Sequence, residues 1–244
     1  MVTTRADATI SPSSEGAPPD RDGTWPYGVG AVCAFVLVAG YLLTFPLYAW
    51  VGGAPPRDLE AQLAYFGEHA AGWWIILALM VLTDLLYIPI FLAIYHASRS
   101  VSRYGALLAC GFMGMFVALD LSLTWTAHAS LITSGVSYAT ATGAHRAALI
   151  TAAAYPSAML QSPLLGIYTI VLPALGILIT GIVMLRGVFN RATAYLALAA
   201  GVSGIAYTAS YVSPSLDAIR IVNALLVTVW FAFVGHGLYR LGHR

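Results

Sequence analysis

The chain alternates long apolar runs with short polar connections. A helix that crosses a bilayer needs about 20 consecutive apolar residues. Six stretches reach this length, and they predict an all-α integral membrane bundle of six transmembrane helices. The stretches are Tyr27 to Val51, Gly72 to Ala97, Tyr104 to about Ala127, Leu164 to Leu185, Ala192 to Val212 and Ile219 to Tyr239.

The composition agrees with a membrane protein. Of the 244 residues, 59% are hydrophobic and 9% are charged, whereas roughly a quarter of the residues in a soluble domain are charged. The formal net charge of +1 gives no electrostatic footprint for nucleic acid. All eleven basic residues are Arg, which excludes lysine-based chemistry such as a Schiff base.

The residues before the first apolar run are polar and rich in Ser, Pro and Gly. They lack hydrophobic periodicity, so we expect residues 1–26 to form a disordered cytoplasmic tail. A secretory signal has an apolar stretch of only about 7 to 15 residues, whereas the first run here spans a bilayer. We therefore interpret residues 27–240 as one six-helix transmembrane domain that begins with an uncleaved helix.

The first and third connections are long, and each is predicted to hold a short interfacial helix. After Asp58, the residues from Leu59 to Ala70 carry an apolar stripe at helical spacing, with Asp58 as the N-cap. In the third connection the stretch His145 to Ala154 is helix-like, and we expect it to end before Pro156.

The positions of the arginines predict the orientation, because cytoplasmic connections carry an excess of positive charge. With both termini in the cytoplasm, eight arginines lie inside and three lie outside. Those inside are Arg5, Arg21, Arg99, Arg103, Arg186, Arg191, Arg240 and Arg244, and those outside are Arg57, Arg146 and Arg220. The stretch Ala192 to Val212 is small around most of its circumference, so we expect it to be a central helix.

Asp84 and Asp120 lie inside apolar runs and are the most informative polar residues. An Asp at the bilayer centre costs about 2.5 to 3.5 kcal/mol on insertion scales, so such a residue is a functional candidate. Counted from the turn between their helices, the two differ in depth by about 4.5 Å. We therefore expect them to interact and at least one of them to be protonated at neutral pH.

Aromatic and polar residues accompany both acids at helical spacing. We interpret seven residues as a candidate ligand pocket, with Asp84 and Asp120 also as candidate catalytic residues. The seven are Asp84, Tyr87, Phe91, Asp120, Thr124, Trp125 and His128. The alternative is structural: each Asp is protonated and bonded to a neighbouring helix, for example through Tyr41, Ser203, Tyr207 or Asn223.

Other motifs carry less. The pair Ser203 and His236 is similar to that of intramembrane serine proteases of the rhomboid family, but the two differ in depth by about 12 Å, far beyond a hydrogen bond. The spacing of His69, His128 and His145 matches no metal motif. There is no phosphate-binding loop, HExxH or dinucleotide fingerprint, so we expect neither a metal nor a cofactor.

Three segments carry a resemblance to a known family. They are the run Leu79 to Ala97 with its Asp84, the segment Gly143 to Leu149, and the segment Val183 to Leu196 before Gly201 and Gly204. Together they resemble the bacterial membrane proteins grouped as DUF4386, over most of the chain after residue 27. The resemblance implies a multi-pass protein of the bacterial plasma (inner) membrane with six spans, and it supplies no activity.

Three functions follow as hypotheses. The leading one is a non-enzymatic binding protein whose intramembrane pocket takes a proton or a small lipid-like ligand. The second is a membrane enzyme that uses an intramembrane Asp as general acid beside aromatic rings, as in terpene-cyclase-like chemistry. The third is a small oligomeric transporter, although no internal repeat is visible. The expected partners are the lipid bilayer, a small apolar or amphipathic ligand and a second copy of the chain, with no nucleic acid.

Overall fold

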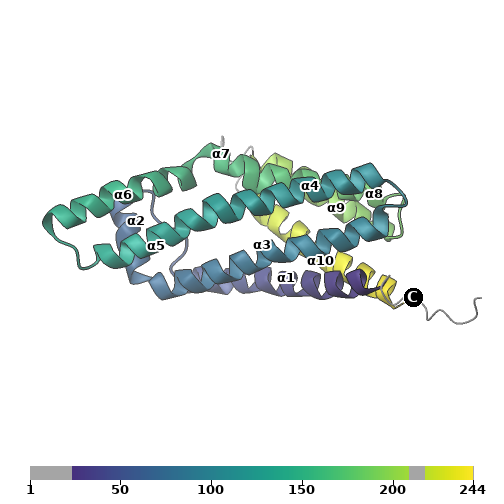
Figure 1. Cartoon of the computed structure of the whole chain (residues 1–244), viewed down its shortest axis with the longest axis horizontal. Coiled ribbons are helices and arrows are strands. Elements are labelled where there is room, and N and C mark those ends of the chain that lie inside the picture. Colours follow the sequence, from purple (N-terminus) through teal and green to yellow (C-terminus); the bar gives the residue numbers. More distant parts are fainter. Residues whose placement is uncertain (1–23, 209–217, 244) are drawn as a thin grey trace, which may run out of the picture.

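The structure is a computed structural model that describes residues 24–208 and 218–243. Within these ranges the chain is entirely helical, without a strand (Figure 1). The elements in chain order are α1 (Trp25–Trp50), α2 (Leu59–Glu68), α3 (Ala70–Ser98), α4 (Arg103–Leu119), the π-helix η2 (Asp120–Trp125), α5 (Thr126–Tyr138), α6 (Gly143–Gln161), α7 (Pro163–Gly166), the π-helix η3 (Ile167–Val171), α8 (Leu172–Met184), α9 (Arg191–Tyr207) and α10 (Ala218–Gly242).

Five continuous helical segments are long and apolar enough to cross a membrane, and the protein is membrane-embedded. They are Trp25–Trp50, Ala70–Ser98, Arg103–Tyr138, Pro163–Met184 and Ala218–Gly242. Large apolar side chains on them face outward, for example Val32 at 63% exposure and Leu107 at 56%. Such a surface matches lipid tails and would be unfavourable in water. The remaining predicted stretch, Ala192 to Val212, corresponds to α9, which has 17 residues.

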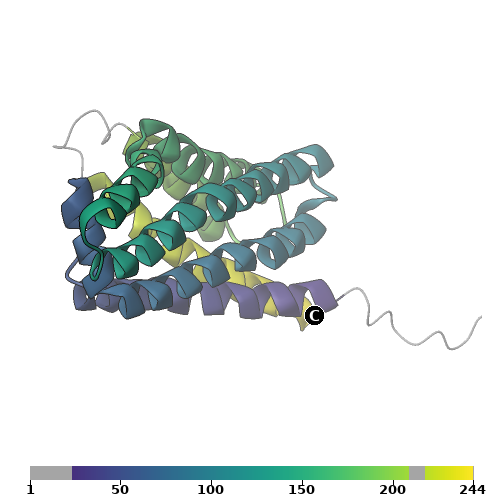
Figure 2. The ribbon, with the colours of Figure 1, turned by 60° about the vertical axis from the view of Figure 1, so that its left-hand side comes forward.

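Six helical segments form a closed ring around the molecular axis. Their neighbours in space run in the order α1, α3, α4, α8, α9, α10 and back to α1. The view in Figure 2 shows α1, α3 and α10 along one side and α4 across from them. Gly242 near the end of α10 lies against Tyr27 and Gly28 at the start of α1. We call this the terminal end of the bundle, and the opposite end, where α2 and α6 lie, the cap end (Figure 1).

The expectation that the fifth stretch is a central helix is wrong. Helix α9 packs on α8 and α10 as one member of the ring, and Ala199 and Val202 on its other face are exposed. Its small residues allow close packing on the face toward α8. At Gly201, for example, an added Cβ would lie only 2.6 Å from the Leu178 Cβ of α8. Small residues thus permit close approach of one neighbour, and they do not determine whether a helix is surrounded.

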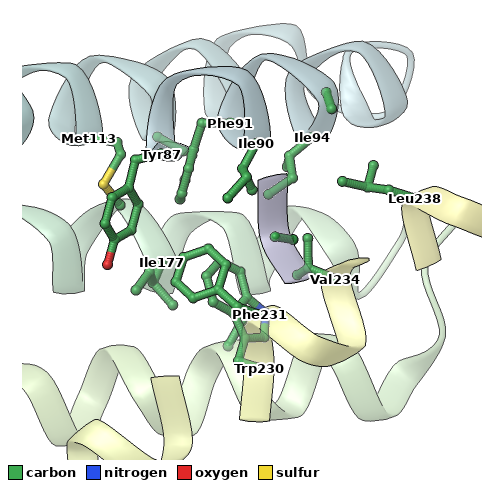
Figure 3. Close-up of a cluster of buried hydrophobic side chains, with 14 of the residues drawn as sticks. Tyr87, Ile90, Phe91, Ile94, Met113, Ile177, Trp230, Phe231, Val234 and Leu238 are labelled. Carbon is green, nitrogen blue, oxygen red and sulfur yellow. The ribbon is translucent and has the colours of Figure 1, made fainter. Parts of the chain in front are cut away.

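The bundle core fills the ring in its terminal-end half. Figure 3 shows Phe91 and Ile94 of α3 pointing toward Trp230 and Phe231 of α10. Trp230 and Phe231 are fully buried, and their rings lie 4.5 Å apart. Because lipid tails are as apolar as these side chains, the core stabilises the bundle through close packing and not through removal of surface from water.

The third membrane helix extends farther than predicted. It continues without a break through α4, η2 and α5 to Tyr138 and has 36 residues, about 54 Å at 1.5 Å per residue. A hydrocarbon core about 30 Å thick cannot cover that length. The extension packs with α2 and α6 around a second core. This cap core consists of Val51, Leu63, Phe66, Trp73, Ile76, Leu131, Ile132, Tyr138 and Ala153.

The helices of the cap touch backbone to backbone. A Cβ on Gly67 of α2 would lie 2.6 Å from the Gly135 carbonyl oxygen of α5. A polar cluster closes the same assembly: the Tyr138 hydroxyl donates to Glu60 at 2.9 Å and accepts a hydrogen bond from Arg146. Arg146 of α6 also lies 3.8 Å from the Glu60 carboxylate. Glycine contact and polar cluster together fix α2 and α6 on α5.

Both short helices of the connections are present. Asp58 caps α2 by accepting a hydrogen bond from the Ala61 N–H at 2.9 Å, as predicted. The apolar stripe of α2 packs on α5, with Leu63 and Phe66 fully buried. The predicted end of α6 before Pro156 is wrong, because the helix runs on to Gln161 with Pro156 buried inside it. The predicted tail, apart from its last residues, lies outside the described residues, and α1 begins at Trp25.

Candidate functional site

The structure places Asp84 and Asp120 side by side, so the depth argument from the sequence is confirmed. Asp84 lies on α3 and Asp120 is the first residue of η2. Their side chains interact both as neighbouring charges and as hydrogen-bonding groups. Both are almost fully buried, at 5% and 6% exposure. We refer to them as the acid pair.

Trp125 is the direct partner of the acid pair. Its indole Nε1–H donates to Asp84 Oδ2 at 2.7 Å, and its side chain also interacts with Asp120. An indole donates but cannot accept, so this contact stabilises negative charge on the pair without supplying a proton for transfer. The structural hypothesis suggested Tyr41, Ser203, Tyr207 or Asn223 as partners, whereas the observed bond comes from a residue five positions after Asp120.

The π-helix explains why both Asp120 and Trp125 reach Asp84. In an α-helix, residues five apart point in different directions, whereas one turn of a π-helix joins residues i and i+5. η2 covers these six residues, so Asp120 and Trp125 fall on the same side. The wider turn is supported by the Thr126 hydroxyl, which donates to the Leu121 carbonyl five residues back at 3.0 Å. Such π-bulges occur frequently at functional sites.

Polar and aromatic groups enclose the acid pair on the cap side. Tyr168 of η3 interacts with Asp120 and Thr124, so the two π-helices meet at the site. His128 contacts the Thr124 carbonyl through Nδ1 at 2.9 Å and stacks on Trp73, with ring centroids 5.6 Å apart. Asp120 Oδ1 and the Thr124 hydroxyl are both buried without a hydrogen bond of good geometry to a described residue, although the two side chains interact.

A pair of tyrosines lies next to the acid pair toward the ring axis. Tyr87 follows Asp84 by three residues on α3, which places both on one helix face. Its hydroxyl is hydrogen-bonded to the hydroxyl of Tyr41 on α1. Both tyrosines interact electrostatically with Asp84 and with Asp120. The two hydroxyls therefore lie within electrostatic range of the acid pair.

The centre of the ring contains a cavity of about 390 Å³ in its cap-end half, which we call the chamber. This volume falls within the usual range of small-molecule sites, about 300 to 1,000 Å³. The wall is mostly apolar with a few uncharged polar groups. It is formed by Tyr41, Thr44, Phe45, Met80, Tyr87, Phe116, Thr169, Ile170, Pro173, Ala174, Ile177, Ala200, Gly204, Tyr207, Asn223, Ala224, Val227 and Thr228.

Of the seven predicted pocket residues, five gather at the acid pair and two do not. Asp84, Asp120, Thr124, Trp125 and His128 form one cluster, and Tyr87 links that cluster to the chamber. Phe91 lies two turns farther along α3, about 10 Å from the level of Asp84, and belongs to the bundle core beside Trp230 (Figure 3). None of the seven except Tyr87 lines the chamber.

Sequence reasoning missed the chamber because its wall comes from every helix of the ring. One signal was present: Asn223 is an isolated amide in an apolar run. It donates to the Ala200 carbonyl at 3.0 Å and to the Ser203 hydroxyl at 2.9 Å. Ser203 is therefore hydrogen-bonded to Asn223 and not to His236, which lies about 20 Å from Asn223 along α10. Among the described residues, no group of His, Cys, Asp and Glu is arranged to hold a metal ion.

The comparisons with known proteins add no relative. No protein-family model, no curated protein and no solved structure matches this chain.

Proposed function

We propose that this chain is a six-span membrane protein that binds a small apolar or amphipathic ligand in the chamber and a proton on the acid pair. The observation that carries the proposal is the chamber itself, which lies inside the ring at the depth of the tyrosine pair. A mostly apolar wall with a few convergent polar groups is typical of ligand sites. In this proposal α9, which has 17 residues, is the sixth span.

The wall of the chamber supports access from the membrane. It includes Phe45 of α1, which is 56% exposed, and Ala224 of α10, which is also exposed. The buried residues of α10 begin only at Trp230, so the cap-end half of this helix is loosely packed. An apolar ligand dissolved in the bilayer would enter between α1 and α10 at this level.

We further propose the orientation that the arginines predict, with the terminal end in the cytoplasm and the cap outside, in a bacterial plasma membrane. α2 and α6 would then lie at or beyond the outer surface of the bilayer. The resemblance to the DUF4386 proteins remains a prediction. We do not propose the general-acid alternative, because neither carboxyl lines the chamber and a substrate there would meet the tyrosine hydroxyls first.

Native mass spectrometry of the purified protein, released from detergent, tests the binding proposal. Wild type should carry a small amphiphile that survives release. Ala224→Phe places a ring in the chamber and should remove the bound mass, because Ala224 lines the wall. Leu225→Phe is the matched control: the next residue is 53% exposed and does not line the chamber, so its bound mass should equal that of wild type. Equal occupancy in all three proteins, or folded wild type with no bound mass, would overturn the proposal.

A further inference from the structure

We propose that the ligand of the chamber is a lipophilic cation, which competes with a proton for the negative charge of the acid pair. This inference rests on the proposed function and adds the chemical class of its ligand. It is carried by the charge at the acid pair, the composition of the chamber wall and the tyrosine pair that separates them.

The acid pair has no cationic partner. In the part of the chain that the structure describes, the recorded ion pair is Arg146 with Glu60 in the cap, and no Arg or His forms one with Asp84 or Asp120. No described residue gives Asp120 Oδ1 a hydrogen bond of good geometry, and the groups that interact with Asp120, Thr124, Asp84 and Trp125, carry no positive charge. An unpaired buried carboxylate in a membrane is strongly unfavourable. The pair must therefore take positive charge from outside the protein, as a proton or as a cation nearby.

The chamber is the place from which such a cation acts on the acid pair. Tyr41 and Tyr87 line the chamber and interact electrostatically with both carboxyls, so the same two side chains border the chamber and lie within electrostatic range of the acid pair. Within the described wall there is no Arg, His, Asp or Glu. In a medium of low dielectric constant the field of the acid pair thus reaches the chamber with little screening.

The wall also suits a large organic cation. It presents the rings of Tyr41, Phe45, Tyr87, Phe116 and Tyr207, and aromatic faces attract cations, most strongly when both partners are desolvated. The ring of Tyr207 already has the Arg220 guanidinium 5.9 Å from its centroid. Because Tyr207 lines the chamber, the positive charge of Arg220 opposes a bound cation there and would favour a bound anion.

Proton competition depends on the groups that face the acid pair. These are Tyr41 from α1, Tyr87 from α3 and Tyr168 from η3, together with Thr124 and the Trp125 indole from η2. His128 of α5 lies beside the Trp125 ring. None of them is a carboxylate. Negative charge at the site therefore belongs to Asp84 and Asp120, and protonation of the pair removes the attraction for a cation.

The experiment compares tetraphenylphosphonium with tetraphenylborate, two ions of nearly the same shape and opposite charge. Equilibrium binding is measured on the full chain in nanodiscs, with empty nanodiscs subtracted. We expect the phosphonium to bind at least tenfold more tightly than the borate. Its affinity should rise as the pH increases from 5 to 9, by up to about tenfold per pH unit where one proton is exchanged, while that of the borate does not rise. The pH series uses wild type, so it does not depend on the folding of a variant.

Variants separate the sources of the preference. Asp84→Asn and Asp120→Asn should each weaken phosphonium binding at least tenfold and flatten its pH dependence, whereas Arg220→Ala should strengthen it. Equal binding of the two ions, or tighter borate binding that Arg220→Ala weakens, would overturn the cation assignment.

The same probes report on the proposed function separately. If Ala224→Phe abolishes binding of the ion that wild type binds, the chamber is supported as the binding site even when the cation assignment fails. If Ala224→Phe and Leu225→Phe bind both ions as wild type does, the chamber is not the site and both proposals fail.

Discussion

Trp125 and Asp84 are 41 positions apart in the chain, and a hydrogen bond of 2.7 Å joins the indole Nε1 to the carboxyl Oδ2. The bond crosses from η2 to α3 at a buried position, because Asp84 is only 5% exposed. It joins the same two elements that bring Asp120 to Asp84. The contact thus joins the two helices that carry the acid pair.

Loss of this bond should destabilise the protein. Trp125→Phe keeps an aromatic ring but removes the only N–H donated to Asp84 Oδ2 among the described groups. We expect the free energy of unfolding in detergent to fall by about 1.5 to 3 kcal/mol, the range for hydrogen bonds to charged groups. Trp74→Phe on the exposed face of α3 is the control, since Trp74 is 44% exposed. Equal stability of the two variants would contradict the assigned role.

The acid pair should hold a proton at neutral pH. Two carboxylates in contact in a medium of low dielectric constant repel each other, and protonation of one removes the repulsion. Infrared spectroscopy at pH 7 should show a protonated carboxyl band that shifts or disappears in Asp84→Asn and in Asp120→Asn. The double variant should lose less stability than the sum of the single variants, because residues in contact are not additive. If the stability losses are mild and strictly additive and no such band appears, the two acids do not interact.

Alanine substitutions at two glycines, Gly135 in the cap and Gly111 on α4, should change the free energy of unfolding in opposite directions. In Gly135→Ala the new Cβ would lie 2.7 Å from the Leu63 carbonyl oxygen, and backbone atoms cannot move aside as a side chain can. We expect α2 and α5 to separate, at a cost of about 1 to 3 kcal/mol. Gly111→Ala on α4 meets no atom within 4 Å and should raise stability by about 0.5 to 1 kcal/mol. Thermal unfolding monitored by circular dichroism compares the two.

Cysteine labelling in intact cells tests the proposed orientation in the membrane. In a background without Cys33 and Cys110, a cysteine at Ser100 between α3 and α4 should resist a membrane-impermeant maleimide, whereas one at Thr140 after α5 should react. Both positions are exposed, so accessibility to the reagent depends on the side of the membrane. Permeabilised cells, in which both react, give the control, and the reverse pattern would require the opposite topology.

Much of the architecture was readable from the sequence. The apolar runs identified the membrane helices because a bilayer demands length and hydrophobicity that no soluble element shows. The cap residue of α2 was predictable too, since an N-cap depends on neighbours in the chain. The similar depth of Asp84 and Asp120 was predictable from the number of residues between each of them and the turn that joins their helices. These inferences succeed because each depends on residues close together in sequence or on a fixed rise per residue.

Only the tertiary structure decided how the helices face one another. The apolar pattern runs around the whole circumference of a membrane helix, so it does not reveal which side of α3 meets α4 or that α9 lies in the wall of the ring. The π-turn at η2 and the passage of α6 through Pro156 depend on side-chain contacts that no local propensity contains. The positions of Phe91 in the bundle core and of Asn223 in the chamber wall have the same cause. In a bilayer, lipid and protein interior are equally apolar, so the rotation of a helix is set by packing and by hydrogen bonds between distant segments.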